Sequence, residues 1–205
     1  MKKEPLRFNK DGKFKIMLIG DLHEYYDMKS DNAAAKVDDT LNLLTKAVNE
    51  LKPDLVIYLG DNARAATESQ MRSIISRITY PVSVNEIPFD LVFGNHDREC
   101  EVPLETQLKL YQEHENCYAF NADDSISGCG NHNIVIKSHD GEKDMFNLWL
   151  IDSNNLYEDS SKSYYDVVHE DQLEWYKKTA KELAEKNGGK PIPSLVFQHI
   201  PVPEE

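Results

Sequence analysis

The sequence opens with short apolar runs that alternate with segments of helical periodicity. Residues 14–19 and 55–59 are apolar runs of strand length, and each stops at a Gly-Asp pair. Between them, apolar side chains recur at steps of four and three, as on one face of an amphipathic helix: Val37, Leu41, Leu44, Val48 and Leu51. The order strand, helix, strand predicts neighbouring parallel strands joined by a right-handed crossover.

The alternation continues through the rest of the chain. The pattern predicts a helix over 68–78, a strand over 89–93 and a helix over 104–114. The spacing of two further runs, 133–136 and 146–151, is typical of a hairpin and predicts an antiparallel part of the sheet system. A last helix is marked by Leu173, Tyr176, Ala180 and Leu183 and ends at 187–189, before a strand over 194–197. We expect an α/β fold in which residues 1–205 form a single domain.

Composition and charge argue against one class of function, nucleic-acid binding, and are compatible with another, metal binding. The chain has 205 residues, 40% of them hydrophobic, and a formal net charge of -13. A general nucleic-acid-binding surface is not expected, because neutralising backbone phosphates requires clustered Lys and Arg. Carboxylates are also ligands for hard cations, so the acidic balance is compatible with a metal site.

The cysteines and the N-terminal residues are the features of the sequence that relate to the cellular compartment of the protein. Cys100, Cys117 and Cys129 have no CxxC spacing, which favours ordinary thiols and leaves one disulfide as the alternative. Polar residues 9–12 occupy the place where a signal peptide would have its apolar core. No apolar run is long enough for a membrane span, so we expect a soluble chain. A cytoplasmic location and secretion after removal of a signal peptide both remain open.

Metal-ligand side chains follow the apolar strands at their carboxyl ends. These side chains are Asp21 and His23, Asp61, Asn95 and His96, and His199. Ligands bind outside the carboxyl ends of strands in open α/β sheets, so the spacing predicts that these residues converge on one site. Gly20, Gly60 and Gly94 precede three of the groups, as expected where the backbone turns sharply and approaches a ligand.

Each part of this pattern is weak when it is taken alone. An Asp after a strand is more often a turn former or a helix cap, and a single His is more often a packed or surface residue. The segment Asn95-His96-Asp97 by itself is compatible with a polar turn. The metal-site interpretation depends on the ordered set, with each group at the correct end of a predicted strand.

The ordered set resembles the signature of the calcineurin-like metallophosphoesterase superfamily. The matching segments are Gly20-Asp21-Leu22-His23, Gly60-Asp61-Asn62, Gly94-Asn95-His96-Asp97 and the strand-terminal His199. Residues 197–204 are similar to the purple-acid-phosphatase-like branch of that superfamily. The resemblance implies layered mixed β-sheets, a β-sandwich flanked by helices.

The resemblance also implies roles for individual residues. Asp21 and His23 would bind a first metal ion, Asn95 and His199 a second, and Asp61 would bridge both. A bridging carboxylate has two oxygens and a negative charge, which lowers the repulsion between two cations about 3.5–4 Å apart. His96 would contact the substrate phosphate and stabilise or protonate the leaving oxygen. Asp97 would accept a hydrogen bond from the other ring nitrogen of His96.

These roles imply a dinuclear phosphoesterase acting on phosphate mono- or diesters. Metal-activated water would attack phosphorus in line, without a covalent enzyme intermediate. Mixed oxygen and nitrogen ligands suit two divalent ions of Mn, Fe or Zn better than Ca, and do not choose among the three.

Two departures from the family pattern have consequences. Purple acid phosphatases have an iron-binding Tyr three residues after the bridging Asp, where this chain has Arg64, so we expect no purple colour. The family's Gly-His-x-His motif, one more ligand for each metal, does not follow His199 before Glu205. We therefore expect a C-terminally incomplete catalytic domain, a gene that continues past Glu205, and weak or absent activity in this segment.

Other function classes remain as alternatives. A non-catalytic metallophosphoesterase-like scaffold would keep the fold and bind a partner. A dinuclear amidase or peptidase on another fold would explain paired metals but not the Gly-Asn-His-Asp turn. The substrate stays open as well: Tyr157, Tyr164 and Tyr165 are candidates for stacking on a base or for packing against the core.

Overall fold

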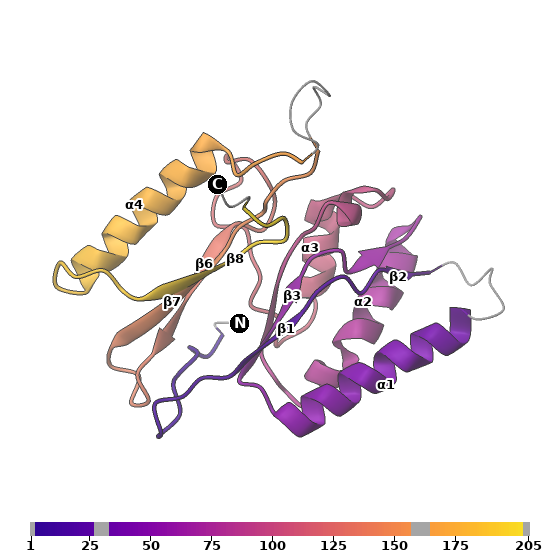
Figure 1. The fold of residues 1–205 in the computed structure, drawn as a ribbon, viewed down its shortest axis with the longest axis horizontal. Coiled ribbons are helices and arrows are strands. Elements are labelled where there is room, and N and C mark those ends of the chain that lie inside the picture. Colours follow the sequence, from indigo (N-terminus) through magenta and orange to yellow (C-terminus); the bar gives the residue numbers. More distant parts are fainter. Residues whose placement is uncertain (1–2, 27–32, 157–164, 203–205) are drawn as a thin grey trace.

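Two three-stranded sheets lie face to face in the computed structural model, which describes residues 3–26, 33–156 and 165–202 (Figure 1). The first sheet is parallel throughout, with the strand order β1 (Ile16–Ile19), β3 (Leu55–Leu59) and β5 (Phe89–Val92). The second sheet is mixed, with the order β6 (His132–Lys137), β7 (Asp144–Leu150) and β8 (Ser194–Phe197). β6 and β7 are antiparallel, whereas β7 and β8 are parallel.

Strand β3 shows why the fold has layers. Alternate side chains of a strand point to opposite faces of the sheet. Leu55 and Ile57 pack into an apolar core shared with the second sheet, and Val56 and Tyr58 pack into the core beneath the helices. All four side chains are buried, because both faces of the first sheet are covered. An uninterrupted apolar run is what such a strand requires.

Helices cover the outer faces of the two sheets. Three pack on the first sheet: α1 (Ala33–Leu51), α2 (Glu68–Ser83) and α3 (Leu104–Gln112). The fourth, α4 (Glu170–Lys186), lies on the outer face of the second sheet. There the ring of Trp149 packs edge-on against Trp175, with centroids 5.6 Å apart. The resulting order of layers is helices, sheet, sheet, helix.

The predicted fold class is confirmed: the chain is a mixed α/β sandwich flanked by helices. The antiparallel pairing of 133–136 with 146–151 is also confirmed. Several boundaries were wrong. Strand β1 begins at Ile16 rather than 14, and helix α2 continues past 78 to Ser83. Its apolar face continues with Val82, four residues after Ile78, and this packing outweighs the helix-breaking tendency of Pro81.

Three short elements were not predicted. The strands β2 (Glu24–Tyr25) and β4 (Ala63–Arg64) pair in parallel, and the 3-10 turn η1 covers His96–Arg98. They follow β1, β3 and β5 respectively, so each extends a strand end that carries predicted ligands. Such elements are too short to leave a periodic pattern in a sequence.

The remaining structural expectations concern cysteines and membrane spans. Cys100, Cys117 and Cys129 are all free thiols, as the sequence favoured. No helix within the described parts of the chain combines the length and apolar character needed to cross a bilayer.

Candidate metal centre

Loops from both sheets meet around Asp61. Asp21 and His23 follow β1, Asp61 follows β3, and His199 follows β8 of the second sheet. One ligand atom each from Asp21, Asp61 and His199 lies within 4.8 Å of the others. His23 joins them, with Nε2 at 3.8 Å from Asp21 Oδ1. The structure therefore brings together residues that are far apart in the sequence.

The two oxygens of Asp61 have different neighbours. Oδ2 lies 3.7 Å from His23 Nε2 and 3.3 Å from His199 Nε2. Oδ1 accepts the backbone N–H of His96 at 2.8 Å. The carboxylate is 4% exposed and is fixed by that hydrogen bond. One oxygen thus faces two imidazole nitrogens that come from opposite halves of the sandwich.

The ligand loops have strained backbones. Asp21, His23 and Asp61 have φ values of 55°, 47° and 53°, in the left-handed region that non-glycine residues rarely occupy. Backbone hydrogen bonds between the loops maintain these conformations: Asp21 N donates to Gly60 O at 3.1 Å, and His23 N donates to Asp61 O at 2.8 Å. Such residues cost about 1–3 kcal/mol each and cluster at functional sites.

Gly60 and Gly94 allow the loops to approach each other. A Cβ on Gly60 would lie 2.8 Å from His199 Nδ1, and a Cβ on Gly94 would lie 2.6 Å from Asp61 N. Both contacts are closer than real Cβ atoms tolerate. The same expectation for Gly20 was wrong: its Cβ would meet only Leu59 Cβ at 3.5 Å, and the left-handed residue there is Asp21.

Asn95 and His199 line one wall of a cavity of about 470 Å³. His199 Nδ1 lies 2.7 Å from Leu59 O, and this contact directs Nε2 towards Asp61. Asn95 precedes turn η1, and its side chain makes no capping hydrogen bond to that turn. Its amide oxygen is therefore not used in local backbone structure.

His96 is oriented by Glu99. Its Nδ1 lies 2.8 Å from Oε2 of Glu99, the residue that directly follows turn η1. The hydrogen bond to Glu99 raises the pKa of His96 above its ordinary value, against the opposing effect of partial burial. The ring packs edge-on against His23 with centroids 5.2 Å apart. Arg64 Nη1 lies 3.6 Å from the same Glu99 oxygen, so this turn contacts the end of β4.

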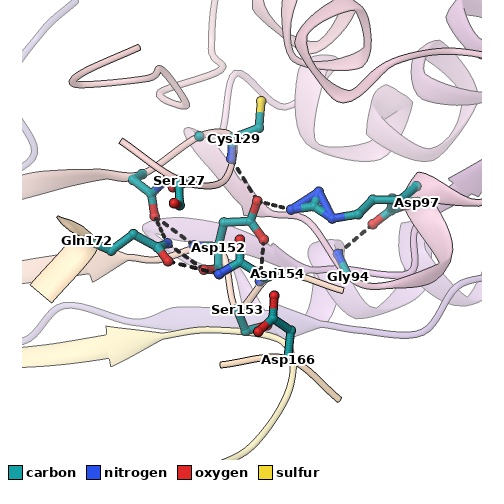
Figure 2. A network of polar contacts seen from close by, with 12 residues as sticks. Gly94, Asp97, Ser127, Cys129, Asp152, Ser153, Asn154, Asp166 and Gln172 are labelled. Atoms are coloured by element: carbon teal, nitrogen blue, oxygen red, sulfur yellow. Dashed lines mark hydrogen bonds and ion pairs between the residues drawn. The ribbon is translucent and has the colours of Figure 1, made fainter. Parts of the chain in front are cut away.

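The predicted hydrogen bond from His96 to Asp97 was wrong. The Asp97 side chain points into the protein, where Oδ2 accepts the N–H group of Asp61 at 2.8 Å. The same oxygen accepts the N–H group of Gly94 at 2.8 Å (Figure 2). Oδ1 accepts those of Asn62 and Ala63 at 2.9 and 3.2 Å. Because the turn places consecutive side chains on opposite sides, Asp97 fixes the loop backbone while His96 faces the site.

Burial and hydrogen bonding act oppositely on Asp97. Complete burial raises the pKa of this carboxyl to about 6, although the backbone N–H donors favour its charged form. The nearby charge of Asp61 adds to the increase. Asp97 therefore links the loop after β3 to the turn after β5.

The donor set suits divalent transition-metal ions. Carboxylate oxygens and imidazole nitrogens are ligands for Mn, Fe and Zn. The Nε2 atoms of His23 and His199 both face Asp61 Oδ2, and Asp21 adds an exposed carboxylate. Asp21, His23, Asp61 and His199 therefore form a donor set that fits a metal centre, with the Asp61 carboxylate between the two imidazoles.

Several residues near the centre were not predicted from the sequence. Glu99 was detectable in principle, because a carboxylate three residues after His96 in a tight turn lies near the ring. Arg98 and Asp152 are joined by an ion pair between η1 and the end of β7, and no local pattern indicates it. Tyr165 lies in the wall of the cavity beside Asn95, whereas Tyr157 and Tyr164 lie outside the described residues.

Comparison with known proteins agrees with this geometry. The family profile described as Calcineurin-like phosphoesterase matches residues 14–205. The chain is 31% identical over 224 residues to "Probable inactive purple acid phosphatase 14" of Arabidopsis thaliana, covering 97% of this chain and 56% of that protein. It is 28% identical to "Phosphatase DCR2" of Saccharomyces cerevisiae, covering 95% of this chain and 36% of that protein.

A solved structure shares the fold. The chain superposes with a TM-score of 0.58 on a dimetal phosphatase from Danio rerio, at 15% identity and over 92% of this chain and 70% of that one. The chain spans about half the length of the curated plant relatives that it matches. The profile match covers most of the sequence and includes all the predicted ligands. The chain belongs to the calcineurin-like phosphoesterase family.

Proposed function

We propose that this chain carries the metal centre of a phosphoesterase that hydrolyses phosphate mono- or diesters. The observation that carries the proposal is the position of Asp61, whose Oδ2 faces His23 from one sheet and His199 from the other. A carboxylate between two imidazoles suits a pair of cations, because its charge lowers their repulsion.

The proposed ligands divide between two ions. Asp21 and His23 would bind the first, Asn95 and His199 the second, and Asp61 both. When bound, the ions would supply Lewis-acid stabilisation of phosphate oxygens and a source of nucleophilic water at neutral pH. Their identity, Mn, Fe or Zn, is part of the proposal.

The chain's own residues would orient the ester and transfer a proton. His96 stands beside His23, and its Nε2 is the ring nitrogen that Glu99 does not occupy. We assign to it the contact with the leaving oxygen and the donation of a proton to that atom. The carboxylate of Glu99 stabilises the protonated ring and limits its rotation. We assign to Asp97 a structural role: its carboxylate accepts hydrogen bonds from Asp61 N and Gly94 N and so fixes the backbone of the loops that carry the ligands.

A second function is favoured by the names of two relatives. Two Arabidopsis thaliana proteins, 31% and 27% identical to this chain, are described as probable inactive purple acid phosphatases. A metal-binding scaffold without turnover would keep the same fold and the same ligands. The two functions differ in chemistry rather than in architecture.

One experiment separates the two functions. The protein is titrated with Mn²⁺ and with Zn²⁺, and each loaded form is assayed against an aryl phosphate and a bis-aryl phosphate diester. Metal binding with turnover that His96→Gln lowers roughly 10²–10⁴-fold supports the phosphoesterase. Metal binding without turnover on either ester favours the scaffold, and absence of metal binding contradicts both assignments of the centre.

A further inference from the structure

The metal centre is divided between two sheets, so its geometry depends on how the sheets are joined near the ligands. His96 and Asn95 belong to the turn after β5, and His199 follows β8 in the other sheet. A core of apolar side chains packs between the sheets, but apolar contacts have no preferred direction. Polar links at the ligand end are therefore the contacts able to fix the two halves relative to each other.

The residues after β7 contact both halves. Asp152 Oδ2 accepts a hydrogen bond from Nη2 of Arg98, the last residue of turn η1. The next residue, Ser153, accepts the backbone N–H of Ile200 on its Oγ at 2.9 Å. Ile200 directly follows His199. Two consecutive residues of one loop thus contact the turn that carries His96 and the segment that carries His199.

Asp152 is itself fixed from several directions. Its Oδ2 also accepts Cys129 N at 2.7 Å, and its Oδ1 accepts Asn154 N at 2.9 Å (Figure 2). Its backbone N–H donates to Asn131 Oδ1 at 3.0 Å, and Gln172 Nε2 donates to its backbone oxygen at 2.8 Å. Asn131 and Gln172 are fully buried. Both oxygens of the carboxylate therefore accept hydrogen bonds from groups other than Arg98, which fix its position.

Arg98 connects the fixed carboxylate of Asp152 to turn η1. Its side chain is 19% exposed, and its backbone N–H donates to Asn95 O at 3.3 Å. The turn has only three residues, so the direction of Arg98 restricts the direction of His96. A planar guanidinium donates along fixed directions, which makes Arg better suited than Lys to this task.

Stability alone does not explain a buried ion pair at this position. The desolvation of two charges offsets most of their attraction, and an apolar pair of similar volume is often as stable. Burial raises the pKa of Asp152 even though the Arg98 charge opposes that effect. What the pair adds, compared with an apolar contact, is a defined distance and direction.

We propose that Asp152 and Arg98 are positioning residues that set the alignment of the His96 turn against the His199 segment. The inference rests on the proposed metal centre for its functional meaning, but the alignment itself is a property of the metal-free protein. Neither residue is among the predicted metal ligands or the groups assigned to the ester. Their effect would pass through Asn95, His96 and His199.

The test compares this pair with a second buried ion pair between the sheets. His132 Nε2 lies 3.0 Å from Asp90 Oδ2, and both side chains are fully buried. Asp90 lies within β5 and His132 at the start of β6, so this pair joins the same two halves. The hydrogen bonds of the two side chains go to each other, to Leu91 N and to Gly130 O rather than to Arg98, Asp152 or Ser153. His132→Gln is therefore the matched control for Arg98→Met.

Three measurements are made on the full chain: thermal unfolding, ring signals of ¹⁵N-labelled histidines without metal, and Mn²⁺ affinity. We expect Arg98→Met to shift the His96 and His199 signals and to weaken Mn²⁺ binding roughly 10–100-fold, the range for loss of a group that orients ligands. His132→Gln should lower the unfolding temperature yet leave both signals and Mn²⁺ affinity unchanged. Arg98→Lys should recover part of the affinity, because it keeps the charge.

The outcomes separate this proposal from the metal proposal. If the wild-type protein binds no metal, the proposed metal centre is contradicted. The histidine spectra of the metal-free variants still test whether Arg98 and Asp152 align the two segments. Unchanged His96 and His199 signals in Arg98→Met would overturn the positioning role, as would equal shifts in His132→Gln. If Arg98→Met does not fold, Asp152→Asn keeps the size of the side chain, removes the charge that faces Arg98 and should shift the His96 signal. An unchanged His96 signal in that variant would then overturn the proposal.

Discussion

His199 Nε2 lies 3.3 Å from Asp61 Oδ2, although the two residues follow strands of different sheets. The contact places an imidazole of the second sheet against the carboxylate that the first sheet supplies. Asp61 also faces His23 at 3.7 Å, so its substitution affects both halves of the centre.

Asp61→Asn should reduce occupancy at both metal positions. The amide has one oxygen and no charge, so it neither neutralises two cations nor offers each an anionic ligand. Metal content and calorimetric titration with Mn²⁺ check this. Asp21→Asn is the control, because Asp21 is assigned to a single ion and should weaken only one of two binding steps. Two tightly bound ions per chain in Asp61→Asn would contradict the bridging role.

His96→Gln should separate metal binding from chemistry. Metal content should stay at the wild-type level, whereas kcat for an aryl phosphate should fall roughly 10²–10⁴-fold, the usual contribution of a positioned acid or base. Steady-state kinetics and metal analysis of the same sample give both values. Loss of metal from His96→Gln would make His96 a ligand instead.

Glu99→Gln tests whether Glu99, rather than Asp97, supports His96. Glutamine keeps the size of the side chain but removes the charge that stabilises a protonated ring. We expect kcat to fall roughly tenfold for an ester with a poor leaving group, which needs the proton, and less for an activated aryl ester. Glu101→Gln, an exposed residue in the same segment, is the control. Equal losses for the two esters would count against a role in proton donation.

Gly94→Ala should disrupt the centre, whereas Gly20→Ala should be tolerated. The new Cβ at 94 would lie 2.6 Å from Asp61 N, and the one at 20 would make an ordinary contact at 3.5 Å. Overpacking of this kind costs about 1–3 kcal/mol in the free energy of unfolding. Urea unfolding and Mn²⁺ titration of both variants check the difference. Similar behaviour of the two alanine variants would show that the loops can separate without loss of the site.

His132 should make stability depend on pH. Complete burial disfavours its charged form, but the charge of Asp90 and the hydrogen bonds to Asp90 and Gly130 O outweigh that effect and raise the pKa of His132 above 6.5. The folded state therefore binds the proton more tightly than the unfolded state. The stabilisation of the folded state by protonated His132 is complete below pH 6.5. It is lost as the pH rises through the pKa that His132 has in the folded state.

Urea unfolding midpoints measured across that range should fall with pH in wild type. The matched variant is His132→Gln, which has no ionisable group at this position and should lose the corresponding part of the slope. An unchanged slope in the variant would assign the pH dependence to other groups.

Local patterns were sufficient for the four helices, for the longer strands and for the polar residues at the strand ends. The apolar run 55–59 predicts β3 because both faces of that strand are buried, and burial on both faces leaves no polar position. The Gly-Asp and Gly-Asn-His-Asp segments identify strand ends that meet at one edge of a parallel sheet. The convergence of Asp21, His23 and Asp61 follows from the topology alone.

Tertiary contacts decided what each polar side chain does. The family resemblance implies a hydrogen bond from His96 to Asp97, but Asp97 accepts N–H groups from the loop after β3 instead. Those donors belong to backbone that is distant along the chain, and every residue type supplies the same N–H. A buried carboxylate takes whichever donors the packing brings to it, so its partners cannot be identified from side-chain identity.

The ion pair of Arg98 and Asp152 was not predicted from the sequence for the same reason: the partners of a buried carboxylate depend on packing. Neither residue interrupts a periodic pattern, and nothing local indicates that an arginine after β5 meets a carboxylate after β7. The sequence by itself determined the longer strands, the parallel pairing of the first two and the polar residues available at the strand ends. Only the packing of the two sheets decided which charges meet, because that distance depends on every side chain between them.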